Sequence, residues 1–150
     1  HIAGEWGHNP LPRLDEEPRP LPQCYCGRRG CVETYLSGPA LARDHALRTG
    51  IAASPAELVR AAAAGEACAE ATLARYEQRL AKALAGVINV LDPDVIVLGG
   101  GLSNIERLVA SVPRLWAAHV FSDVIATRLL RHRHGDSSGV RGAALLWQST

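Results

Sequence analysis

Residues 91–101 read Leu-Asp-Pro-Asp-Val-Ile-Val-Leu-Gly-Gly-Gly, and this stretch decides the fold class. Residues 95–98 are an unbroken, mostly β-branched apolar run, which is typical of a strand buried on both faces. Pro93 ends a preceding helix because proline disfavours the helical conformation in the residue before it. The three glycines then form a turn. The stretch therefore predicts a helix, a buried strand and a glycine turn in succession.

The flanking segments extend this pattern to an α/β fold. Upstream, Ser37-Gly38-Pro39 starts a helix that runs to Gly50, and Ser54-Pro55-Ala56-Glu57 is a capping box that starts another. A long helix follows Gly65, with Cys68 as a small buried residue. Its expected apolar stripe is Ala67, Ala71, Ala74, Leu80, Leu84, Val87 and Leu91. Downstream, we expect a helix over 104–119, a strand over 124–130 and a helix over 139–147.

The composition excludes several classes of protein. The 150 residues carry 16 Lys+Arg against 15 Asp+Glu, so no large positive field favours nucleic acid or an anionic membrane. Charged residues and a proline interrupt the longest apolar stretch, 80–102, so no membrane span is predicted. No secretion signal is visible, which favours a cytoplasmic location. Met is absent even at position 1, so we expect a processed chain or part of a longer protein.

The strongest local signal lies in residues 1–37, which are rich in Pro, Gly and Cys and have no helical period. Residues 15–22 are expected to form an exposed, stiff connector, and a short helix is expected near Cys31. Cys24, Cys26 and Cys31 can converge with His8 into a tetrahedral Cys₃His set, which favours structural zinc. The alternative is disulfides or free thiols, although two cysteines this close would form a strained bridge.

Two carboxylates flank this cluster. Glu5 lies three residues before His8 and Glu33 two residues after Cys31, so zinc ligation would hold both near one point. Rigidly held polar groups of this kind suit the hydroxyls of a sugar. The alternative for each carboxylate is a surface charge or a helix cap.

Two other features are weaker. Gly99, Gly100 and Gly101 follow a strand, where ligands bind in open α/β sheets, but the sequence matches neither a Walker A loop nor a dinucleotide fingerprint. A plain turn is the alternative. His132 and His134 lie in a basic segment, which favours a solvated loop over a metal site.

Taken together, residues 5–8 (Glu-Trp-Gly-His), 24–33 (Cys-x-Cys-Gly-x-x-Gly-Cys-x-Glu) and 91–101 resemble the ROK family of repressors, open reading frames and sugar kinases. Residues 5–12 and 134–144 are most similar to its bacterial fructokinase/mannokinase branch. The resemblance covers essentially the whole chain, but only the C-terminal half of such a protein.

The resemblance implies a two-lobed, actin-like (ribonuclease-H-like) ATPase, usually a homodimer, that phosphorylates a fructose-like hexose with ATP and Mg²⁺. Residues 1–37 would form the sugar-site loop and zinc knuckle, and residues 38–150 a helix-rich C-terminal lobe. By motif match, His8, Cys24, Cys26 and Cys31 would hold zinc. Glu5, His8 and Glu33 would bind the sugar, and Gly99 and Gly100 would border the nucleotide.

Three family elements are absent: the Asp-x-Gly-Gly-Thr phosphate loop, the Asn-Asp pair that carries the general base, and the Gly-Thr-Gly loop. We therefore expect the catalytic Asp upstream of residue 1, in an N-terminal lobe that this chain lacks, and no catalysis by the chain alone. An alternative is the effector-sensing part of a ROK transcriptional regulator, and a third possibility is a zinc-stabilised scaffold without a ligand.

Overall fold

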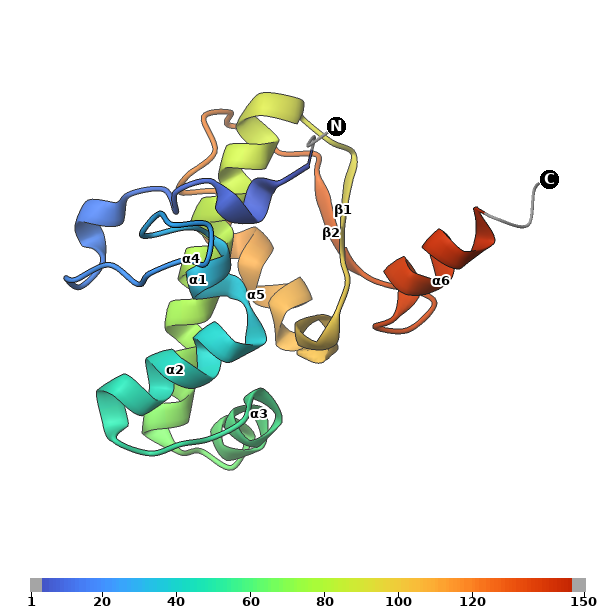
Figure 1. Cartoon of the computed structure of the whole chain (residues 1–150). Coiled ribbons are helices and arrows are strands. Elements are labelled where there is room, and N and C mark those ends of the chain that lie inside the picture. The colour runs from blue at the N-terminus through green and yellow to red at the C-terminus, as the bar shows by residue number, and fades with distance from the viewer. Residues whose placement is uncertain (1–3, 147–150) are drawn as a thin grey trace.

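A computed structural model of the chain describes residues 4–146. The elements combine helices with a parallel sheet, in agreement with the predicted α/β class (Figure 1). In chain order they are the 3₁₀ helices η1 (Trp6–His8) and η2 (Leu14–Glu16), the helices α1 (Glu33–Leu36), α2 (Gly38–Thr49), α3 (Pro55–Ala63) and α4 (Ala67–Leu91), the strand β1 (Val95–Leu98), η3 (Gly101–Asn104), α5 (Arg107–Trp116), β2 (Arg128–Arg131) and α6 (Ser138–Leu145).

Helix α4 is the element around which the others pack. It contacts α1, α2, α3 and α5, and α6 projects away from this body (Figure 1). The main core joins Leu58 of α3, Leu73 of α4 and Leu108 of α5. The predicted stripe on α4 is partly wrong: Leu80 and Leu84 are buried, but Ala67, Ala71 and Leu91 at the ends of the stripe are exposed. Neighbours surround the middle of α4 on several sides and leave its two ends uncovered.

The helix starts predicted at Ser37 and Ser54 and the stop predicted before Pro93 are confirmed. The Ser54 side chain accepts a hydrogen bond from the Glu57 backbone N–H at 3.3 Å, while the Glu57 carboxylate accepts from the Ser54 backbone N–H at 2.7 Å. This reciprocal pair is the expected capping box. Ser37 caps α2, and α4 ends at Leu91, with Asp92 as its C-cap directly before Pro93. Local chemistry therefore sets these boundaries.

The sheet is smaller and more exposed than the sequence predicts. Strand β1 pairs in parallel with β2, from Val95 opposite Arg128 to Leu98 opposite Arg131, and the described residues form no further strand in this sheet. The prediction that β1 is buried on both faces was wrong, since Val97 is 59% exposed. The helix expected over 104–119 is shorter than predicted: α5 covers Arg107–Trp116, and Asn104 belongs to the preceding η3. The final helix is α6, and the end predicted for it at Trp147 lies outside the described residues.

Two further expectations need correction. Cys68 is exposed rather than buried. The connector over residues 15–22 is largely exposed, but Glu17 within it is buried because its carboxylate accepts hydrogen bonds from Arg79 of α4. Neighbouring Glu16 pairs with Lys82 at 2.8 Å, so the connector is fastened to α4. Between residues 4 and 146, no helix combines the length and apolar character needed to cross a membrane.

Candidate metal and ligand site

The N-terminal segment folds back on itself and brings the predicted ligands together. The backbone N–H of Leu11 donates to the Gly30 carbonyl at 2.9 Å, and that of Val32 donates to the Asn9 carbonyl at 2.9 Å. A bridge between Gln23 and Arg29 closes the turn that carries the first two cysteines. Gly30 has φ +77°, and a Cβ there would lie 3.0 Å from the Leu14 methyls. This position therefore requires glycine.

His8, Cys24, Cys26 and Cys31 converge, as the spacing predicts, with one ligand atom from each residue lying within 4.8 Å of the others. Cys26 Sγ lies 3.6 Å from Cys31 Sγ, and Cys24 Sγ lies 3.5 Å from His8 Nδ1. A tetrahedral zinc ion with Zn–S of about 2.3 Å and Zn–N of about 2.0 Å separates two sulfurs by about 3.8 Å, and sulfur from nitrogen by about 3.5 Å. The donor set and its spacing therefore fit zinc.

The thiols are unpaired, and their surroundings differ. All four cysteines are free, and the 3.6 Å between Cys26 and Cys31 is far longer than a disulfide bond of about 2.05 Å. Arg28 donates hydrogen bonds from its backbone and side chain to Cys26, which lowers the pKa of that thiol to about 6. Two effects raise the pKa of Cys31 to about 11: burial is the larger, and a hydrogen bond with Cys26 adds to it. The cluster thus contains one thiol that ionises readily, as a metal ligand must.

The second nitrogen of His8 faces away from the sulfurs. Its Nε2 lies 2.7 Å from the Tyr25 hydroxyl and 3.8 Å from Oε2 of Glu33, which α1 positions. The His8 and Tyr25 rings meet edge-on, with centroids 4.9 Å apart. Sequence reasoning missed Tyr25, although its place between Cys24 and Cys26 is a usable signal. One imidazole can therefore serve a metal ion through Nδ1 and a polar ligand through Nε2.

Glu5 also belongs to this neighbourhood. It precedes η1 and forms no capping hydrogen bond, which counts against the helix-cap alternative for this residue. Desolvation raises the pKa of the Tyr25 phenol, and the negative charges of Glu33 and Glu5 raise it further. Both carboxylates therefore influence the pKa of the same hydroxyl.

A cavity of about 560 Å³ links η1 to the glycine turn. Trp6 lines it together with Gly99 and Gly101, while side chains of α4 and β1 supply apolar walls. Gly100, Glu5, His8 and Glu33 are not among its lining residues. Sequence reasoning missed Trp6 as the residue that joins these two regions. A small molecule of ordinary size fits a cavity of this volume.

The two histidines after β2 lie outside the cluster. His134 is exposed, as expected of a solvated loop. For His132 that expectation is wrong, because both ring nitrogens are buried and have no hydrogen-bond partner among residues 4–146. Its backbone N–H donates to the Leu98 carbonyl at 3.0 Å, which places the residue beside the end of β1.

Comparison with known proteins adds independent information. A family model described as "ROK family" matches residues 1–150. The chain is 40% identical to an N-acetyl-D-glucosamine kinase of Photobacterium profundum over 97% of its own length and 50% of that protein. An N-acetyl-D-glucosamine kinase of Aliivibrio fischeri is 38% identical with the same coverage. The chain therefore spans about half the length of these curated relatives, and both are N-acetyl-D-glucosamine kinases rather than fructokinases or mannokinases.

Solved structures resemble the chain as well. A ROK hexokinase from Thermus thermophilus superimposes with a TM-score of 0.78 and 30% identity, over 96% of this chain and 47% of that one. A ROK family glucokinase from Streptomyces griseus, in complex with glucose and AMPPNP, superimposes with a TM-score of 0.78 and 25% identity, over 96% of this chain and 51% of that one. A ROK family transcriptional regulator, a homologue of the E. coli MLC protein, superimposes with a TM-score of 0.69 and 26% identity, over 88% of this chain and 36% of that one.

Proposed function

Because this chain belongs to the ROK family, we propose that the protein containing it is an ATP-dependent kinase that phosphorylates a hexose hydroxyl. The supporting observation is the 40% identity to an N-acetyl-D-glucosamine kinase over 97% of the chain. We take N-acetyl-D-glucosamine as the first candidate substrate, in place of the fructose-like hexose expected from the sequence. ATP with Mg²⁺ is the phosphoryl donor in this proposal.

We further propose that His8, Cys24, Cys26 and Cys31 hold one structural Zn²⁺. The fit of their donor atoms to tetrahedral spacing supports this proposal. Bound zinc would tie the residues around His8 to the turn that carries Cys24 and Cys26. The ring of His8 would then be fixed, with Nε2 directed toward Tyr25 and Glu33.

The sugar contacts in this proposal are Glu5, His8 and Glu33, in the loop and knuckle formed by residues 1–37. Carboxylates accept hydrogen bonds from sugar hydroxyls, and the imidazole can donate or accept one. Gly99 and Gly100, in the α/β part over residues 38–150, would border the nucleotide. The general-base Asp and most phosphate contacts would come from the rest of the protein, and the active form would be a homodimer. Phosphoryl transfer then depends on how the parts position sugar and nucleotide.

A ROK transcriptional regulator is the second candidate, favoured by the likeness to the MLC homologue. In such a protein the same cluster would shape an effector pocket, with no phosphoryl transfer. The lower TM-score and coverage of that structure, compared with the kinases, place this candidate second.

The kinase proposal is tested on the full-length protein. ADP release is measured with ATP, Mg²⁺ and N-acetyl-D-glucosamine, glucose, mannose or fructose in turn, and we expect the highest kcat/KM with N-acetyl-D-glucosamine. Sugar binding without turnover, together with sugar-dependent DNA binding, would support the regulator instead.

The role of Glu33 is tested by Glu33→Gln. Losing a charged hydrogen-bond acceptor is expected to raise KM for the sugar about 10- to 100-fold, with zinc content unchanged. The matched control is Glu66→Gln, since Glu66 is exposed and makes no capping hydrogen bond. An unchanged KM in Glu33→Gln would remove that residue from the sugar site.

A further inference from the structure

The ring nitrogen of His8 that would face the sugar already has a partner within the chain. Its Nε2 lies 2.7 Å from the Tyr25 hydroxyl, which is a normal hydrogen-bond distance. Glu33, proposed to bind the same sugar, lies farther away, with its Oε2 3.8 Å from this nitrogen. The hydroxyl of Tyr25 therefore takes the place on the ring edge that a sugar hydroxyl needs.

The chemistry of the His8 ring gives Nε2 a single hydrogen bond to offer. Cys24 Sγ lies 3.5 Å from Nδ1, so Nδ1 is the nitrogen that faces the proposed metal ion. A ring that ligates zinc through Nδ1 carries its proton on Nε2 and donates one hydrogen bond there. The Tyr25 oxygen accepts that bond. A sugar oxygen must therefore replace the tyrosine oxygen to receive it.

The backbone around this contact is fixed on both sides. The His8 carbonyl accepts a hydrogen bond from Cys31 Sγ at 3.6 Å, and only 16% of the His8 side chain is exposed. In the turn that carries Tyr25, the backbone N–H of Cys24 donates to the Arg28 carbonyl at 2.8 Å. An exchange of partners at Nε2 must therefore take place through the side chain of Tyr25.

This side chain has little else to hold it. Tyr25 is 83% exposed, and its hydroxyl has no second hydrogen-bond partner among residues 4–146. Its ring meets that of His8 edge-on. By contrast, Tyr35 and Tyr76 are only 7% and 4% exposed. Moving the Tyr25 hydroxyl aside uncovers little buried surface, so the main cost is one hydrogen bond of ordinary net strength.

We propose that Tyr25 determines the affinity of the sugar site: its hydroxyl holds Nε2 of His8 in the sugar-free protein and is displaced by a hydroxyl of the sugar. The inference rests on the proposed kinase function and adds Tyr25 to the residues of that site. Because the tyrosine and the sugar compete for one nitrogen, removing the tyrosine hydroxyl strengthens sugar binding. Removing a group that contacts the sugar has the opposite effect.

Isothermal titration calorimetry on the full-length protein as purified, without ATP, tests this with N-acetyl-D-glucosamine, glucose, mannose and fructose. For the sugar that binds most tightly, we expect Tyr25→Phe to lower Kd about three- to tenfold, because Nε2 is no longer occupied for most of the time. Zinc content and Tm should stay close to those of the wild type, since Tyr25 is exposed and outside the Cys/His cluster. An unchanged or higher Kd in Tyr25→Phe would overturn the proposal.

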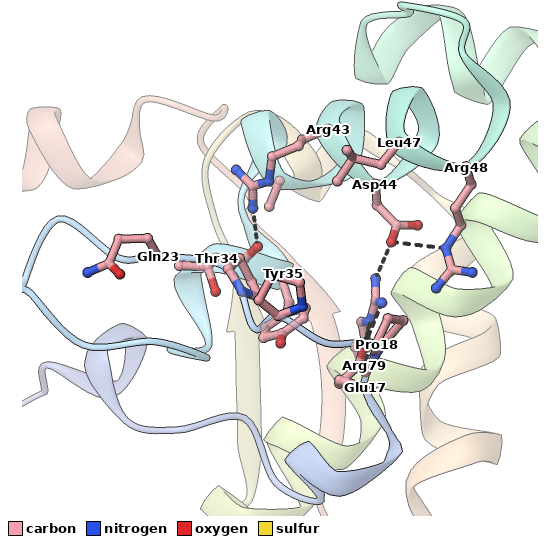
Figure 2. Close-up of a pocket in the computed structure, with 13 residues that line it drawn as sticks. Glu17, Pro18, Gln23, Thr34, Tyr35, Arg43, Asp44, Leu47, Arg48 and Arg79 are labelled. Atoms are coloured by element: carbon pink, nitrogen blue, oxygen red, sulfur yellow. Dashed lines mark hydrogen bonds and ion pairs between the residues drawn. The ribbon is translucent and has the colours of Figure 1, made fainter.

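The matched control is Tyr35→Phe, the same chemical change at a tyrosine outside the sugar site. Tyr35 lines a separate cavity between the connector and α2, which none of the proposed sugar contacts lines (Figure 2). Its hydroxyl has no hydrogen-bond partner in the part of the chain that the structure describes. Its loss should leave Kd unchanged. An equal fall of Kd in both variants would contradict the assignment, because the effect would then not depend on His8.

The same measurements separate this inference from the proposed function. If neither the wild type nor Tyr25→Phe binds any of the four sugars, both proposals are wrong. If the wild type binds and phosphorylates a sugar but Tyr25→Phe has the same Kd, only the role of Tyr25 is wrong. NMR of isotope-labelled tyrosine follows the displacement itself. The signal that is missing in Tyr25→Phe should shift when the sugar is added to the wild type, and a signal that stays in place would contradict displacement.

Discussion

Replacing Arg79 with methionine tests how the connector is fastened to α4. Arg79 Nε donates to both carboxylate oxygens of Glu17, at 3.0 and 3.1 Å, and Nη2 donates to one of them at 2.6 Å. The side chains of Arg79 and Glu17 are only 8% and 6% exposed. Methionine preserves most of the apolar stem and removes every donor, so Glu17 is left buried without its cation.

The size of the effect follows from the options open to Glu17. Removing one partner of a buried ion pair typically costs about 3–5 kcal/mol. A buried glutamate can instead take up a proton, which for an ordinary carboxyl costs about 1.4 kcal/mol for each pH unit above about 4.3. This protonation cost sets an upper limit on the stability lost through the unpaired Glu17, about 3.7 kcal/mol at pH 7 and about 1 kcal/mol at pH 5. In the variant the carboxyl is protonated more easily when folded than when unfolded, so the loss of stability must grow as pH rises.

Urea denaturation, monitored by tryptophan fluorescence, measures the loss in free energy of unfolding at pH 7 and at pH 5. We expect Arg79→Met to lower the free energy of unfolding by about 3–4 kcal/mol at pH 7 and by about 1 kcal/mol at pH 5. Adding Glu17→Gln should restore part of the loss at pH 7, because no buried charge remains uncompensated. An equal loss at both pH values, or one well below about 1 kcal/mol at pH 7, would refute the reasoning.

Two further predictions concern metal and acid. The variant Cys26→Ser should lose zinc and have a lower Tm. The control Cys68→Ser, at an exposed cysteine outside the cluster, should keep both its zinc and its Tm. If metal analysis finds zinc retained in Cys26→Ser, Cys26 is not a zinc ligand. Burial alone would raise the pKa of Asp44, but the surrounding arginines outweigh it and hold that pKa below its usual value. This stabilisation is present above the unfolded pKa of about 3.9 and is lost as pH falls through the folded value. Unfolding between pH 5 and pH 2 should therefore show a smaller loss of stability for Asp44→Asn, and parallel curves would exclude the effect.

Features set by neighbouring residues were predictable from the sequence. The capping box at Ser54 and the break at Pro93 depend on a few adjacent groups, and both are present. The Cys/His cluster was also predictable, because its three thiols lie within eight residues and need only a short turn to meet. In each case, spacing along the chain determines the spatial arrangement.

Features set by distant contacts were not predictable. Glu17 and Arg79 are 62 residues apart, and an acidic, proline-rich segment gives no sign that one of its carboxylates will be buried. The exposure of Val97 depends on how many strands flank β1, which its own residues do not specify. Tyr25 pairs with His8 only after the turn has folded. The expected similarity to the fructokinase branch was not confirmed, since the two curated relatives described above are N-acetyl-D-glucosamine kinases.

X-ray absorption at the zinc edge, with metal analysis of the purified full-length protein, tests the proposed zinc centre most directly. We expect one zinc per chain, with three sulfur neighbours at about 2.3 Å and one nitrogen at about 2.0 Å. Metal-free protein that keeps its fold, or a zinc shell of oxygen and nitrogen alone, would contradict the proposal that these four side chains gather around one ion.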